Sequence, residues 1–335
     1  MLSAPSIDKT RDEKKSLSEK ELSTFLMYAI GLLRFEILHV WALHRGSASA
    51  RCLYPTDLYI TIPACSSVHL DAGIYYYDPY HHALLKVRAG DWSDTIVRCC
   101  GLEFESTPEF IIGLGSNFGR TAYYYEDFAY RLVTQEIGLL ESNVVLAGKC
   151  NGFSPYVCHF FQDDAINEIY EVTGIEESMM SILLFFTNNV PDSREYHDNL
   201  LTQKLKGMYK RYPPAFIDPK SYLNPNWYTG LVKMNRSSYL NEVHLGTNMH
   251  LKKEKIKTVY NDYIKLPNVV AHLPHVDISY AWRNRYSGAN VDLNPVSYKI
   301  PIEHFSAMLK LAYPPGQRTY MKYEVKKTYE VKKTQ

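Results

Sequence analysis

Apolar residues recur at helical spacing between residues 129 and 148. The apolar positions follow one another at intervals of three or four: Tyr130, Val133, Ile137, Leu140, Val144 and Ala147. This spacing predicts a helix with one face turned to a core. Glu136 and Asn143 interrupt the apolar face, and we expect each to have a polar partner. Asp127 is the predicted N-cap of this helix. A Tyr- and Arg-rich stretch, predicted as a loop, precedes it, and loops held by helices often carry chemistry.

The rest of the pattern predicts an α+β protein built on an antiparallel or mixed sheet. One or two helices begin near Ser18 and extend to residue 43, and a short helix capped by an Asp covers 161–169. β-Branched and aromatic runs bounded by Pro, Gly or Asp predict strands at 58–62, 73–77, 84–87, 109–114 and 179–186. From residue 191 onwards prolines become frequent, which indicates a connecting region at 191–278 with helices at 194–211 and 248–265.

A weak internal repeat suggests a partial second copy of the first domain. Aligning Leu22 with Phe305 places the start LSEKELSTFLMYA over IPIEHFSAMLKLA, with Ser23 on Ser306 and Leu26 on Leu309. The predicted organisation is a domain at 17–190, a helical linker region at 191–278, the start of a second copy or a swapped arm at 279–318, and a charged tail at 319–335.

Composition and charge exclude several functional classes. The chain of 335 residues carries 37 basic and 36 acidic side chains, so no overall positive field favours nucleic acid or an anionic membrane. Its six cysteines lack the spacing of a zinc site, and no metal site is predicted. The polar start is unlike a secretory signal. We therefore expect a cytoplasmic protein with reduced thiols.

Three segments, in order, resemble nitroreductase-superfamily flavoproteins. ASARCLYP is similar to the family's PSAGALYP element, and GIYYYDPYHHALLKVRAGD to its GVYHYDP stretch. YYYEDFAYRL followed by EIG and SNVVLAGKCNGF, and then FQDDAINEI, resembles the SagB-type branch, the azoline dehydrogenases of thiazole/oxazole peptide clusters. A later trace, WRNRYSGANVDLNPVSYKIPIEHFSAMLKLAY, is similar to the family's RRSxRxF opening.

The resemblance implies a nitroreductase-like sandwich that binds FMN at an interface, commonly in a homodimer. It also implies a peptide substrate and other cluster-encoded modification enzymes as partners. The implied cofactor-binding residues are Arg45, Ser49, Ala50, Leu53, Tyr54, Asn143, Arg283, Arg285 and Ser287. The sequence departs from the family at three positions: Arg51 replaces a Gly, Cys52 an Ala, and Tyr124 the Lys of a Lys-Tyr pair.

Azoline oxidation needs a base for a carbon-bound proton, and Tyr125 with Tyr124 are the candidates. Tyr125 would need a nearby cation such as Arg120 or Arg131. The alternative interpretation is that these tyrosines only pack a loop, and that the arginines are solvated. Three functions follow: an FMN-dependent peptide azoline dehydrogenase, a flavin-dependent reductase of dehydroamino acids or small electrophiles, or a non-catalytic nitroreductase-like scaffold subunit.

Overall fold

The computed structural model describes residues 17–36, 43–196, 228–240, 278–284, 301–303 and 305–306. The chain divides into two compact units, and nearly all described residues belong to the first, which comprises Met1–Leu245 and Asp277–Ser287. The second unit contains residues 302, 303, 305 and 306, which are helical. The predicted helix at 248–265 and the predicted tail lie outside the described residues.

Helix α1 (Glu19–Ile30) begins after Ser18, as predicted, and its first turn forms a complete capping box. The Ser18 hydroxyl accepts a hydrogen bond from the Glu21 amide, and the Glu21 side chain accepts one from the Ser18 amide. The helix ends at Gly31, and the chain continues into strand β1 (Leu32–Phe35), which pairs with β2 (Leu43–Arg45). A second helix in this region was therefore a wrong prediction.

The central sheet has six strands in the order β5-β4-β3-β7-β9-β8. These are β3 (Thr56–Ile62), β4 (Gly73–Asp78), β5 (Ala83–Ala89), β7 (Phe110–Asn117), β8 (Ser154–Cys158) and β9 (Glu177–Phe186). All five neighbouring pairs are antiparallel. Five of these strands lie where the sequence predicts them, and β8 was not predicted.

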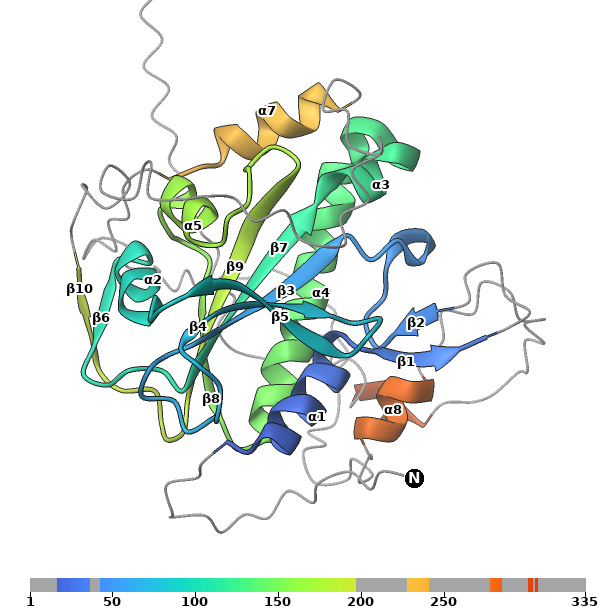
Figure 1. Cartoon of the computed structure of the whole chain (residues 1–335). Coiled ribbons are helices and arrows are strands. Elements are labelled where there is room, and N and C mark those ends of the chain that lie inside the picture. The colour runs from blue at the N-terminus through green and yellow to red at the C-terminus, as the bar shows by residue number, and fades with distance from the viewer. Residues whose placement is uncertain are drawn as a thin grey trace, which may run out of the picture. The chain divides into compact units, whose positions relative to one another are not determined.

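Helices cover both faces of the sheet (Figure 1). On one face α1 and α4 (Ala129–Cys150) pack against alternate residues of the strands, such as Leu58, Ile112 and Phe185. On the other face α2 (Ser93–Cys99) and α5 (Asp163–Ile169) bury a second core that includes Ile111 and Leu184. Successive side chains of each strand thus point alternately into the two cores, as expected for a sheet that is buried on both faces.

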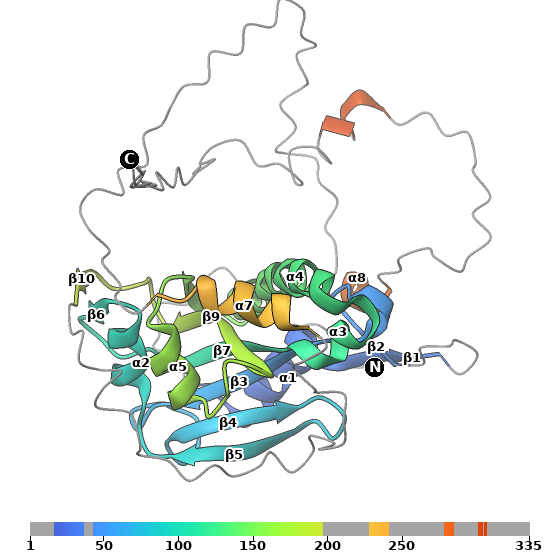
Figure 2. The ribbon, with the colours of Figure 1, turned by 90° about the horizontal axis from the view of Figure 1, so that it is seen from above.

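Segments from the predicted connecting region, and one from the predicted second copy or arm, also belong to the first unit. β10 (Ser193–Glu195) pairs with β6 (Leu102–Phe104), so the predicted helix at 194–211 does not begin there. Helix α7 (Thr229–Ser237) lies alongside α4 and α5, and α8 (Ile278–Asn284) lies beside β1 (Figures 1 and 2). Among the described residues, no helix has both the length and the apolar character needed to cross a membrane.

Two predicted helix caps are wrong. Asp127 lies in the 3-10 turn η2 (Glu126–Phe128), and its Oδ1 accepts a hydrogen bond 2.8 Å long from the Leu231 amide, in the first turn of α7 rather than of α4. Helix α5 begins after Gln162 without a side-chain cap. Spacing along the sequence cannot identify a cap whose helix is 104 residues away.

Candidate functional site

The short helix η1 (Ala50–Cys52) forms a strained turn at the entrance to β3. Arg51 and Cys52 both have φ of 53°, and Tyr54 has φ of 46°, in the left-handed region. Residues with a Cβ rarely occupy this region, and each costs roughly 1 kcal/mol. The backbone at residue 51 therefore keeps a conformation that suits the Gly of the resembling family, although an arginine occupies it.

Hydrogen bonds fix both ends of this turn. The Ala50 amide donates to Glu136 Oε1 of α4 at 2.8 Å, and the Tyr54 amide donates to Ser49 Oγ at 2.9 Å. The Leu53 amide donates to the Ala50 carbonyl at 3.1 Å. Burial raises the pKa of Glu136, and the Ala50 amide opposes this shift. The predicted polar partner of Glu136 is thus confirmed, and it is the turn itself.

Arg45 of β2 lies against the same turn and is 6% exposed. Its Nη1 donates to the Thr56 carbonyl at 3.1 Å, and its guanidinium stacks 4.7 Å from the centroid of the Tyr54 ring. Burial lowers the Arg45 pKa, while Asp57 raises it. Arg45 Nε is buried and has no hydrogen-bond partner among the described residues. It is therefore a buried donor without an acceptor in this part of the chain.

Tyr124 and Tyr125 lie at the end of a helix, α3 (Phe118–Tyr125), so the predicted loop there is wrong. The chain leaves α3 at Glu126, which has left-handed backbone with φ of 48°. The guanidinium of Arg51 stacks 4.8 Å from the Tyr124 ring centroid and 5.8 Å from that of Tyr125. The structure thus brings together the two segments that carry the family departures.

Arg120, predicted as a partner of Tyr125, binds Asp57 instead. Its two terminal nitrogens contact the two Asp57 oxygens at 2.9 Å and 2.8 Å, and Nη1 also donates to the Tyr54 carbonyl at 3.1 Å. This bidentate pair raises the Arg120 pKa against the effect of burial. The ion pair therefore anchors the end of the η1 turn to β3.

A second buried carboxylate, Glu177, lies near this ion pair and was not predicted. Tyr59 donates a hydrogen bond to Glu177 Oε1 at 2.9 Å, and Tyr76 donates one to Asp57 at 3.3 Å. Burial, followed by the charge of Asp57, raises the pKa of Glu177 to about 8. The sequence signal that could have identified this pair is an acidic residue in the first two positions of two apolar strands, Asp57 in β3 and Glu177 in β9.

The other predicted cofactor residues lie elsewhere. Asn143 of α4 accepts a hydrogen bond from Trp282 Nε1 of α8 at 3.4 Å, and Arg283 donates to the Tyr28 hydroxyl at 2.9 Å. Trp282 also stacks on Tyr28 at 5.5 Å between ring centroids. Seven residues, about 10 Å of helix, separate Asn143 from Glu136. Arg285 and Ser287 lie outside the described residues.

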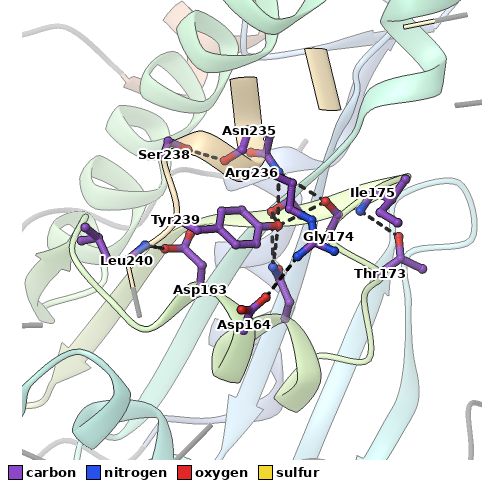
Figure 3. A network of polar contacts seen from close by, with 12 residues as sticks. Asp163, Asp164, Thr173, Gly174, Ile175, Asn235, Arg236, Ser238, Tyr239 and Leu240 are labelled. Carbon is purple, nitrogen blue, oxygen red and sulfur yellow. Dashed lines mark hydrogen bonds and ion pairs between the residues drawn. The ribbon is translucent and has the colours of Figure 1, made fainter. Parts of the chain in front are cut away.

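A separate polar network joins α7 to α5 and β9 (Figure 3). The Tyr239 hydroxyl contacts Asn167, Ser178 and Asn235 at 2.9, 3.0 and 3.2 Å, and donates to the Gly174 carbonyl at 3.2 Å. Asp163 accepts from the Leu240 amide at 2.6 Å. With the Asp127 cap of α7, this network ties residues 228–240 to the end of α3.

The comparisons with known proteins give distant similarities. No family model matches the chain. A curated protein of Methanocaldococcus jannaschii, described as a nitroreductase, is 24% identical over 125 residues, which are 37% of this chain and 62% of that protein. The chain thus spans less than two thirds of this relative.

Two solved structures are also similar. A nitroreductase of Anabaena variabilis is 25% identical, with 50% of this chain and 34% of that one covered and a TM-score of 0.46. The Escherichia coli microcin synthetase McbBCD complex, with truncated pro-MccB17 bound, is 19% identical, with 57% and 75% covered and a TM-score of 0.44. The six-stranded antiparallel sheet flanked by helices confirms the predicted α+β class.

Proposed function

We propose that this protein is an FMN-dependent oxidoreductase that acts on a ribosomally made peptide and oxidises azolines to thiazoles or oxazoles. The observation that carries the proposal is the meeting of the Ser49–Tyr54 turn with Tyr124 and Tyr125 through Arg51. The first segment resembles an element of nitroreductase-superfamily flavoproteins, and the second resembles the loop and helix of the SagB-type branch. The fold and the relative described as a nitroreductase support flavin-dependent redox chemistry.

The donors around the turn fit a flavin in part. Three arginines, Arg45, Arg51 and Arg120, surround it, and Arg45 Nε is a buried donor without a partner among the described residues. FMN, when bound, would accept the hydride that leaves the azoline ring. Cationic donors beside the turn would then stabilise the negative charge that reduction places on a flavin ring.

The chain's own residues supply binding and proton transfer. Tyr125, half-buried at the end of α3, is the proposed acceptor of the carbon-bound proton, and Tyr124 flanks the substrate. Arg51 fixes the orientation of both rings by stacking. Arg285 and Ser287 are proposed phosphate ligands, carried by the segment that follows α8.

Two observations support the proposed homodimer and the proposed arm. Leu132, Leu139 and Leu146 repeat every seven residues on α4, with Leu139 50% and Leu146 37% exposed, which is a pattern suited to packing on another helix. α8 packs on Tyr28 and Asn143, so the later arm begins within the first unit. A Leu139→Glu variant should shift the protein from dimer to monomer in light scattering, whereas Thr134→Glu, exposed on another side of α4, serves as the control for added charge.

Flavin uptake is the first test of the proposal. The full chain should bind added FMN stoichiometrically, with flavin absorbance bands that remain after gel filtration. Arg285→Ala with Ser287→Ala should weaken FMN binding by about tenfold to a hundredfold, the range for lost charge-assisted contacts. A colourless protein that takes up no FMN would instead favour the scaffold hypothesis.

The direction of electron flow separates the two enzyme hypotheses. A synthetic azoline peptide should bleach the bound flavin without nicotinamide, and mass spectrometry should show the loss of two hydrogens from the peptide. Tyr125→Phe should slow this step by about 10² to 10⁴, while Tyr123→Phe, an exposed neighbour, should not. Bleaching by NAD(P)H alone would support the reductase, for which the missing Lys at position 124 is the motivating observation.

A further inference from the structure

Cys52, His44 and Glu36 form a chain of polar side chains outside the roles proposed above. The Cys52 thiol lies 3.7 Å from His44 Nδ1, within hydrogen-bond distance for sulfur. On the other side of the ring, His44 Nε2 lies 3.6 Å from Glu36 Oε2. A thiol, an imidazole and a carboxylate in this order are the parts of an activated cysteine nucleophile.

The fold holds this imidazole in place. β1 and β2 pair so that His44 is opposite Arg34, and Arg34 Nε holds Glu36 Oε1 at 2.6 Å. His44 is only 8% exposed, whereas Cys52 is half-buried on the strained η1 turn. The base is therefore fixed and shielded, while the sulfur remains accessible.

A second group faces the thiol from the end of the turn. The Tyr54 hydroxyl accepts a hydrogen bond from the Arg45 amide at 3.0 Å, which leaves its proton available to a sulfur acceptor. Burial raises the pKa of Tyr54 to about 12, and the neighbouring Cys52 contributes in the same direction. A phenol that stays protonated and an imidazole thus flank the same sulfur.

The backbone of the turn restricts which reaction this thiol can perform. Acyl transfer needs backbone amides that point at a tetrahedral oxyanion. Here four amides of the turn already have acceptors. The Ala50 amide donates to Glu136 and the Cys52 amide to the Ser49 carbonyl. The Leu53 amide donates to the Ala50 carbonyl and the Tyr54 amide to Ser49 Oγ. The occupied amides therefore suit an electrophile whose negative charge develops away from the attacked carbon, as it does on the carbonyl oxygen of a conjugated alkene when the β-carbon is attacked.

We propose that Cys52 is a nucleophilic thiol, with His44 as its base and Glu36 as a positioning residue, that adds to activated alkenes conjugated to a carbonyl. His44 Nδ1 takes the proton of the thiol, and the sulfur electron pair forms a bond to the β-carbon of the alkene. The alkene π electrons move to the α-carbon, which receives the proton back from the imidazolium. The step is an addition without a leaving group or net redox change, so it requires no cofactor.

Maleimide is a suitable probe because it is itself an alkene conjugated to carbonyl groups. The full chain, without FMN, is treated with limiting N-ethylmaleimide at pH 6 to 8, and peptide mapping by mass spectrometry follows each cysteine. Cys65, which is exposed, is the matched control within the same molecule. Since accessibility alone favours Cys65, faster labelling of Cys52 requires chemical activation.

We expect Cys52 to react about tenfold faster than Cys65 at pH 6, where an ordinary thiol is almost entirely protonated. His44→Gln should remove this advantage and leave the rate at Cys65 unchanged. Glu36→Gln, at a partly exposed position, should reduce the advantage and leave it partly recoverable at higher pH. Far-ultraviolet circular dichroism establishes that each variant is folded.

Labelling of Cys65 ahead of Cys52 at every pH in the wild-type chain would overturn the proposal, and this result needs no variant. Equal labelling of Cys52 in wild type and folded His44→Gln would also overturn it. Because no flavin is present, failure of the flavin proposal leaves this experiment unaffected.

Discussion

The η1 turn and the Tyr239 network are two polar regions of one unit, and they differ in how their groups are satisfied. The Tyr239 hydroxyl has partners in Asn167, Ser178, Asn235 and the Gly174 carbonyl, and the contacts tie α7 to α5 and β9 (Figure 3). Around the η1 turn, three residues have left-handed backbone, and Arg45 Nε is buried without a partner among the described residues. Satisfied networks specify structure, whereas strain and unpaired donors concentrate where chemistry occurs. The comparison therefore assigns the turn to function and the network to stability.

The largest stability effect should come from Arg120→Ala, which leaves Asp57 as a buried, unpaired carboxylate. Removing one partner of such a pair costs about 3 to 5 kcal/mol, and Asp57 is only 4% exposed. The free energy of unfolding in urea provides the measurement. Arg98→Ala, which breaks an exposed ion pair with Asp94, is the control and should cost less than about 1 kcal/mol. Equal losses would show that the Asp57 pair is not buried in solution.

The next effect should come from Tyr239→Phe. It removes one hydroxyl and leaves Asn167 and Ser178, both buried, short of a partner. We expect a loss of about 2 to 3 kcal/mol, with little change in labelling of Cys52. If this variant lowered Cys52 labelling as strongly as His44→Gln, the division between a structural and a chemical region would fail.

Gly230→Ala tests the contact between α7 and the end of α3. A Cβ at this position would clash with the carboxylate of Asp127, so the Asp127 cap of α7 must break. Loss of the cap costs about 1 to 2 kcal/mol, and the gain from replacing a helical glycine offsets part of it, so we expect a net loss of about 1 kcal/mol. Gly138→Ala is the matched helical control, because a Cβ at that position would meet no atom within 4 Å. That variant should be more stable than wild type by about 0.5 to 1 kcal/mol.

Asp163 should make the attachment of Leu240 depend on pH. Burial raises the pKa of Asp163 from 3.8 to about 7. The folded state therefore binds the Asp163 proton more tightly than the unfolded state does. The stability contributed by the protonated carboxyl is complete below about pH 4 and is lost as the pH rises to about 7. Hydrogen exchange at the Leu240 amide should accelerate by about tenfold beyond the intrinsic rate over this range, and Asp163→Asn should remove the change. A local probe is needed because Glu177, with a pKa of about 8, gives the whole unit a slope of the same sign.

The smallest effect should come from Arg51→Gly. Glycine adopts the left-handed conformation without a steric cost, but the stacking on Tyr124 is lost. We expect a net gain of about 0.5 kcal/mol in the free energy of unfolding. Ala50→Gly, one residue earlier and without positive φ, should lower stability instead. A loss in both variants would mean that the turn relaxes in solution.

The sequence by itself determined the elements whose periodicity reflects burial. The apolar face of α4 is recognisable in the sequence because the helix buries one side. The strands are recognisable as β-branched and aromatic runs because both faces of the sheet are buried. The start of α1 at Ser18 depends on neighbouring residues only. The polar interruptions Glu136 and Asn143 correctly predicted polar partners.

Only the tertiary structure decided which groups meet. Asp127 caps a helix 104 residues away, Arg120 binds Asp57 rather than Tyr125, and His44 reaches Cys52 through the pairing of β1 with β2. Such contacts depend on how separate elements are oriented, and no periodicity along the chain encodes that orientation. The left-handed turn at Arg51 follows the same rule, because tethers to α3 and α4 impose a conformation that its own residues disfavour.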